Sequence, residues 1–291
     1  MDRLLTCFLS GIALLALLTM TCCNRSIDLY SRSYSTVEQQ KLAQQFLAGV
    51  GTYYYQGSPQ EIFLIKEGLK YNPNSASLWR EFGAPTIKRG FARASYIYYG
   101  KAVDLDPLEW QGWRGYLYLY FYRDYQRALA DFNATDTLTP NFIDYPQSTS
   151  VDFMRGICYL QLGEYDQALT FFEQHIEAEI GMVGEAYIDS RVFLFEGIAY
   201  FKLDKLDQAI KSFNRGLRVH EEKNADLWYW LAKSLMKKGQ LSLAATALER
   251  AEEMYKRGYF HERSYVEEFY ETYPAMIANL QEELVRIESN K

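Results

Sequence analysis

A short motif recurs at nearly even spacing in the second half of this 291-residue chain. It reads DYQRAL from Asp124, EYDQAL from Glu164 and KLDQAI from Lys205, so that successive copies begin 40 and 41 residues apart. Each copy follows an aromatic-rich stretch and precedes a phenylalanine. Repetition at this period is typical of stacked helical arrays, in which each unit buries its apolar face against its neighbours. We therefore expect a repeat array and not a single-core enzyme.

The overall charge argues against one class of partner. The chain is 48% hydrophobic, which is ample for a core, and its formal net charge is −6. Nucleic-acid binding needs clustered Lys and Arg to meet the phosphates, and no block of like charges interrupts the sequence. We expect no nucleic-acid partner.

Small and aromatic residues keep a fixed register within the repeats. Gly156 precedes Phe172 by 16 residues, and Gly197 precedes Phe213 by the same number. Helices that cross closely need small side chains at the point of contact, with larger ones beside them. In these features the chain resembles the tetratricopeptide repeats (TPR), which are 34-residue hairpins of two antiparallel helices, A and B. The resemblance implies an all-α fold, a right-handed α-α superhelix (TPR solenoid) with a C-terminal capping helical segment.

The TPR phase divides the chain into segments. A TPR array would span residues 42–258, with about six repeats at 42–75, 76–109, 109–141, 149–182, 190–223 and 225–258. The two halves of the third repeat align only with a slip of one residue. Residues 259–291 continue with apolar residues three or four apart. Because Pro274 interrupts this run, we expect two capping helices or a kink there.

The N-terminus has the layout of a targeting segment. After Arg3 the chain is mostly apolar to Met20, and the run ends at Cys22 and Cys23. This arrangement is typical of a secretory signal, and the cysteine pair resembles a bacterial lipobox, in which one Cys is acylated. The match is imperfect, because neither cysteine follows the usual Leu and small residue. We predict a lipoprotein signal peptide at 1–22 and a polar tether at 23–41, the alternative being an uncleaved signal anchor. The expected location is the cell envelope, with the folded part in the periplasm.

The family resemblance also predicts where a protein or peptide partner would bind. In TPR proteins, defined positions of each A helix line the concave groove, and here they are mainly aromatic and, toward the C-terminus, basic. Such rigid aromatics favour protein partners. The alternative for each is packing between neighbouring A helices. The predicted groove residues are Phe46, Tyr53, Tyr54, Trp110, Trp113, Tyr120, Phe121, Phe153, Phe201, Lys202, Tyr229, Lys233 and Lys237.

Signals for chemistry are weak. His175, His220 and His261 fall in no metal-ligand spacing, and we expect no metal and no cofactor. Position 9 of the repeats never holds the Asn with which one TPR subtype binds C-terminal carboxylates. The leading hypothesis is a lipid-anchored interaction scaffold. A second is an accessory subunit of an envelope assembly or solute-transport system that binds a small hydrophobic ligand. An enzyme built from the loops would have only Asp144, Glu185 and Asp189 for its chemistry.

Overall fold

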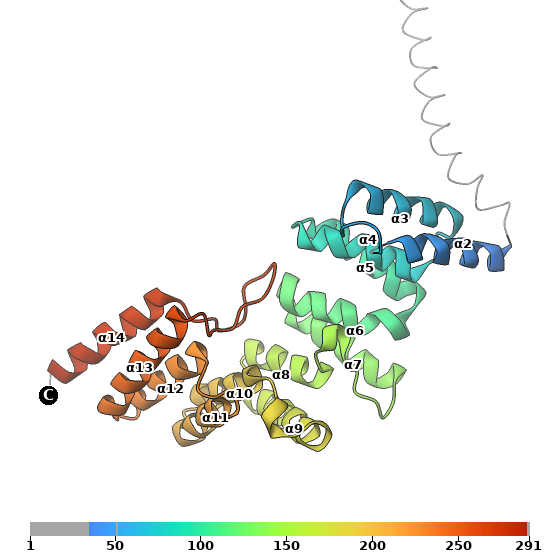
Figure 1. The fold of residues 1–291 in the computed structure, drawn as a ribbon. Coiled ribbons are helices and arrows are strands. Elements are labelled where there is room, and N and C mark those ends of the chain that lie inside the picture. The colour runs from blue at the N-terminus through green and yellow to red at the C-terminus, as the bar shows by residue number, and fades with distance from the viewer. Residues whose placement is uncertain (1–34, 51, 290–291) are drawn as a thin grey trace, which may run out of the picture. The chain divides into compact units, whose positions relative to one another are not determined.

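The computed structural model describes residues 35–50 and 52–289 of the chain (Figure 1). Within these ranges every regular element is a helix, and consecutive helices pack in pairs. The predicted fold class, an all-α array of TPR-type hairpins, is therefore confirmed. The chain forms two compact units, which divide between Trp110 and Gln111.

The N-terminal unit contains two helical hairpins. Ser35 begins the first by a reciprocal capping box, in which its hydroxyl accepts from the backbone of Glu38 and the Glu38 carboxylate accepts from the backbone of Ser35. Ser58 caps the second helix in the same unit, ahead of a proline that suits the first helical turn. The helices are α2 (Thr36–Gly49), α3 (Pro59–Tyr71), α4 (Ala76–Lys88) and α5 (Ala92–Leu105), followed by the first residues of α6 (Pro107–Leu117).

The C-terminal unit continues with four hairpins and a final helix. From α7 onward each α-helix packs on the one that follows. Two short 3₁₀ turns, Pro146–Ser148 and Glu185–Tyr187, lie in the loops where the repeat spacing lengthens. After α6 and the π-helix η1 (Tyr118–Tyr122) come α7 (Tyr125–Leu138), α8 (Val151–Leu162), α9 (Tyr165–Met182), α10 (Ser190–Lys202), α11 (Leu206–Val219), α12 (Ala225–Lys237), α13 (Leu241–Lys256) and α14 (Pro274–Ser289).

Glycine permits the close approach within these hairpins. A Cβ added to Gly197 of α10 would lie 2.3 Å from a ring carbon of Phe213 of α11, and one added to Gly156 of α8 would lie 2.4 Å from the ring of Phe172. Both phenylalanines are fully buried. The aromatic ring thus rests on the bare backbone of the partner helix, which explains the register seen in the sequence.

The π-helix η1 explains the one-residue slip in the third repeat. Here Gly115 meets Phe132 in the same way, since an added Cβ would lie 2.6 Å from the ring. The two residues are 17 apart in sequence and not 16. A π turn accommodates one residue more than an α turn, so the extra residue is absorbed at Tyr118–Tyr122. With Gly115 at the contact, Trp110 and Trp113 lie one position away from the register in which they were assigned to the groove.

The C-terminal segment differs from its prediction. Residues 257–273, the return segment, form no helix, and Pro274 begins the single helix α14 instead of breaking a pair. Proline suits the first helical position because its missing N–H has no partner there anyway. The apolar residues before Pro274 have a helical spacing but contact several different helices, as described next. The prediction of two helices or a kink in 259–291 was therefore wrong.

Candidate partner-binding surface

The return segment joins the array at the start of α12 and reaches toward α6 and α8 (Figure 1). The buried carboxylate of Asp226 accepts hydrogen bonds from the backbone N–H groups of His261 at 2.7 Å and Thr272 at 2.8 Å. Beside them, the carbonyl oxygen of Tyr259 accepts from the backbone N–H of Ala225 at 2.7 Å. The segment is therefore a loop with both ends held at one point.

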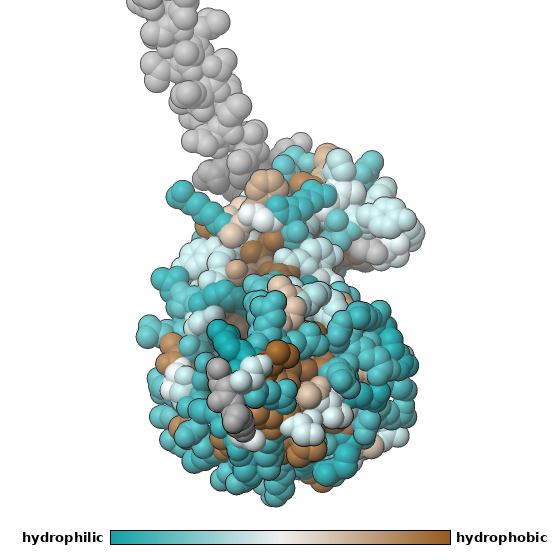
Figure 2. Space-filling view, turned by 90° about the vertical axis from the view of Figure 1, so that its left-hand side faces the viewer, coloured by the Kyte–Doolittle hydropathy of each residue, from teal (hydrophilic) through white to brown (hydrophobic). Residues whose placement is uncertain are grey.

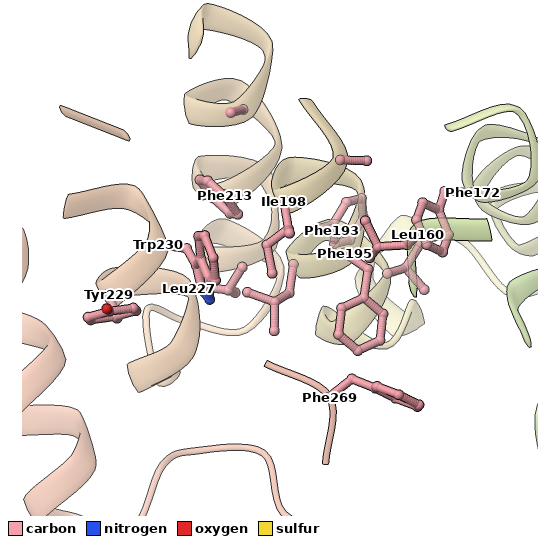
Figure 3. Close-up of a cluster of buried hydrophobic side chains, with 14 of the residues drawn as sticks. Leu160, Phe172, Phe193, Phe195, Ile198, Phe213, Leu227, Tyr229, Trp230 and Phe269 are labelled. Carbon is pink, nitrogen blue, oxygen red and sulfur yellow. The ribbon is translucent and has the colours of Figure 1, made fainter. Parts of the chain in front are cut away.

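Aromatic contacts hold the middle of this loop against the A helices. The ring centroid of Phe269 lies 5.6 Å from that of Tyr120, and the guanidinium of Arg123 lies 3.9 Å from the Phe269 ring. Tyr270 packs on Phe195 of α10 at 6.2 Å. Figure 3 shows Phe269 beside Phe195, on a segment separate from the helices that carry the rest of the cluster. The segment thus binds along the face where a peptide partner was expected.

Charge pairs complete the attachment of the return segment. The buried carboxylate of Glu268 lies 3.1 Å from guanidinium nitrogens of both Arg191 and Arg263. Arg263 in turn stacks over the ring of Tyr120 at 3.6 Å. Burial alone would raise the pKa of Asp189, but the hydrogen bonds and charge of Arg191 hold it at about 2. The pair of Glu268 with Arg191 of α10 and the packing of Phe269 hold the loop on the array, whereas the pair of Glu268 with Arg263 lies within the loop.

Four predicted groove residues are buried. Exposed fractions are 1% for Tyr120, 3% for Phe153, 5% for Tyr229 and 7% for Trp110. Tyr120 lies under the return segment, and Phe153 stacks on Phe195 at 5.8 Å. Packing within the chain already uses these surfaces. Burial to this degree favours the packing alternative for these four side chains.

The other aromatic predictions have mixed surroundings. Tyr53 and Tyr54 follow the end of α2 and are 78% and 42% exposed, so they stand on a loop and not on an A helix. Phe46 is half-buried and stacks on Tyr71 at 5.5 Å. In the C-terminal unit, Trp113 and Phe121 are also half-buried. They do not join the cluster described next.

The predicted residues at the C-terminal end do come together. Phe201 of α10 and Lys233 and Lys237 of α12 line one pocket of about 260 Å³. Helix α14 closes its other side, a contribution that the sequence did not predict. Figure 2 views the molecule from the α14 side, where hydrophobic side chains surface among hydrophilic ones. The remaining lining residues are Met236, Leu280, Glu283 and Ile287. We call this site the lysine–aromatic pocket.

Lys233 occupies the centre of an aromatic cradle. Its ammonium nitrogen lies 4.7 Å from the ring of Trp230, 5.8 Å from that of Phe201 and 6.0 Å from that of Tyr229. Burial lowers the pKa of Lys233, the charge of Lys202 lowers it further, and Glu283 acts in the opposite direction. A partly desolvated cation held by three aromatic rings is a preorganised contact for an anion.

The remaining predictions concern chemistry and the anchor. Asp144 accepts a hydrogen bond from a threonine, and Glu185 and Asp189 pair with Arg215 and Arg191, so each loop carboxylate has its own partner. In the described residues, no group of three or more potential metal ligands occurs. Among the helices so described, none combines the length and apolar character that a bilayer span requires. Both predicted acylation sites, Cys22 and Cys23, lie outside the described residues.

Comparison with known proteins identifies the repeats. Two family models described as tetratricopeptide repeat match residues 150–177 and 196–258, and neither describes an enzyme. The chain thus contains tetratricopeptide repeats in the part where the register is clearest. No curated protein sequence matches it.

Solved structures share the fold at low sequence identity. The type IV pilus biogenesis factor PilW aligns with a TM-score of 0.56 at 16% identity, over 75% of this chain and 93% of that one. PilF of Pseudomonas aeruginosa aligns with the same score and identity, over 84% and 97% of the two chains. MamA of Desulfovibrio magneticus RS-1 has a TM-score of 0.53 at 20% identity, over 62% and 96%. At such identities the similarity concerns the fold.

Proposed function

We propose that this chain is a lipid-anchored TPR scaffold of a bacterial cell envelope, which binds a protein partner at the lysine–aromatic pocket. One observation carries the binding part. Three residues chosen from the sequence as groove contacts, Phe201, Lys233 and Lys237, meet in one pocket that the return segment leaves open. The return segment occupies the neighbouring A-helix face, which restricts where a partner can bind in this unit.

The fold favours a scaffold over a catalyst. Its helical pairs present side chains on rigid elements, and the carboxylates proposed for a loop enzyme are each occupied by a partner. The pocket is also small. A volume of about 260 Å³ falls below the roughly 300–1,000 Å³ of sites that enclose whole small molecules. This favours a side chain of a protein partner over the small hydrophobic ligand of a transport subunit.

The anchor is tested separately from binding. Replacing both Cys22 and Cys23 with Ser should move the full-length protein from the membrane fraction to the soluble fraction, because no acyl chain could be attached. A single Cys22→Ser or Cys23→Ser change should have this effect only at the acylated position. If the double variant stays in the membrane fraction and the wild type takes up no labelled fatty acid, the lipid anchor is wrong and the apolar run acts as an uncleaved signal anchor.

Binding is tested by affinity capture with the full-length protein. Phe201→Ala should lose a protein that the wild type captures, because it removes an aromatic wall of the pocket. Phe63→Ala, which removes a 60% exposed aromatic from α3 of the other unit, is the matched control. Equal capture by both variants would argue against the pocket as the binding site.

A further inference from the structure

The partner's chemistry can be inferred from how the chain holds its own return segment. That segment presents an acidic residue followed directly by an aromatic one, Glu268 and Phe269. The carboxylate lies between two arginines, and the ring packs against aromatic side chains and under a guanidinium. Of the two arginines, Arg191 belongs to α10 and Arg263 to the segment itself, so the array contributes one arginine to the carboxylate and aromatic side chains to the ring.

The lysine–aromatic pocket also places a positive charge beside aromatic side chains, and no described segment of the chain fills it. Around Lys233, no described carboxylate lies within 4.0 Å of the ammonium group, whereas Lys237 is paired with Asp204 at 2.6 Å. Lys202 adds a third positive charge, and Glu283 of α14 is the one carboxylate among the residues that line the pocket. The net charge around Lys233 is therefore positive, which favours a negatively charged ligand.

The floor of the pocket selects an apolar neighbour for that charge. Met236 and Leu280 are 9% and 7% exposed, and they lie beside Phe201 and Ile287 at the junction of α10, α12 and α14. An apolar side chain placed there would gain roughly 25 cal/mol for each Å² of surface removed from water. The pocket volume suits one such side chain.

We propose that the lysine–aromatic pocket binds an acidic segment of a protein partner, an inference that rests on the proposed function. A carboxylate of the segment would lie at Lys233, and an adjacent aromatic or aliphatic side chain would pack on Met236 and Leu280. Helix α14 and the lysines thereby form a second acidic-segment site beside the one that the return segment fills.

The probe for this proposal is a synthetic peptide with the sequence of residues 266–272, VEEFYET, labelled for fluorescence anisotropy. Its neutral counterpart VQQFYQT has the same shape and lacks the carboxylates. With the full-length protein, the acidic peptide should bind about tenfold or more tightly than the neutral one, because hydrogen bonds to charged groups contribute most to such contacts. Raising the salt concentration should weaken this preference.

Variants locate the binding. Lys233→Gln should reduce the affinity for VEEFYET about tenfold. Lys237→Gln, at an exposed position that does not support the core, should also reduce it. Lys238→Gln is the control, because Lys238 pairs with Asp207 and does not line the pocket. Unchanged unfolding midpoints would show that the variants remain folded.

Several outcomes would overturn the proposal. They are equal binding of the two peptides, absence of binding, or binding that Lys233→Gln and Lys237→Gln leave unchanged. Lys233-dependent binding of laurate without peptide binding would assign the pocket to a lipid carboxylate and refute the peptide proposal. If the peptides fail while Phe201→Ala still abolishes capture of a partner, the scaffold function stands and only the acidic specificity is wrong.

Discussion

Replacing Gly197 with Ala tests whether bare backbone at the helix contact is essential to the array. The new Cβ would lie 2.3, 2.6 and 2.7 Å from three ring carbons of Phe213. Carbon atoms pack best about 3.5–4.0 Å apart, so the ring or the helix must move by more than about 1 Å. Phe213 is fully buried and has little room to do so.

The expected cost follows from two opposing terms. Overpacking a filled core destabilises by about 1–3 kcal/mol, whereas Ala exceeds Gly in helix propensity by about 1 kcal/mol. We expect Gly197→Ala to lower the free energy of unfolding by up to about 2 kcal/mol in all.

Gly181→Ala is the matched control in the same unit. Gly181 lies in α9, and an added Cβ would have nothing within 4 Å. With no clash, this change should leave stability unchanged or raise it by up to about 1 kcal/mol. Urea denaturation, followed by far-ultraviolet circular dichroism, measures the free energy of unfolding of both variants. Equal stabilisation by the two substitutions would refute the close-approach explanation of the glycine register.

The remaining predictions concern the return segment and pH. Asp226→Asn should speed amide hydrogen exchange in residues 259–273 but not in α8, because the Asp226 carboxylate accepts two backbone hydrogen bonds from residues 259–273. Unchanged exchange would show that other contacts hold the return segment in place. Phe269→Ala should have the same local effect through lost aromatic packing, read by the same measurement. Burial lowers the pKa of His175 below 6.5, so the unfolded chain takes up the proton first and stability should fall as the pH drops below about 6.5. His175→Phe, which keeps the stacking on Phe153, should reduce this fall, and an unchanged pH profile of unfolding would contradict the assignment.

The repeat pattern predicted the fold because it records local contacts. Glycine and phenylalanine 16 residues apart, as at Gly156 and Phe172, describe the packing of one hairpin, and the same spacing recurs along the chain. The irregular repeat was detected as a slip of one residue, but the sequence did not show how the slip is absorbed. Only the structure reveals the π-helix at Tyr118–Tyr122.

The candidate site was predicted in part. Lys233, Lys237 and Phe201 share a pocket because their helices are neighbours in the array, which the TPR register implies. A capping helix was predicted in the region of α14, but its place beside the pocket was not, and the return segment escaped prediction. The spacing of Phe269 and Tyr270 is compatible with a helix, and nothing local shows that these residues pack on η1 and α10 instead.

The hairpins, their order and the small residues at which they touch follow from the amino-acid pattern, since these features depend on neighbours within about 40 residues. Which aromatic side chains remain available to a partner follows from the folded array. That choice depends on contacts such as Arg123 with Phe269, made between residues far apart in the chain. Local periodicity carries no record of such contacts, because each forms only after the array has brought its faces together.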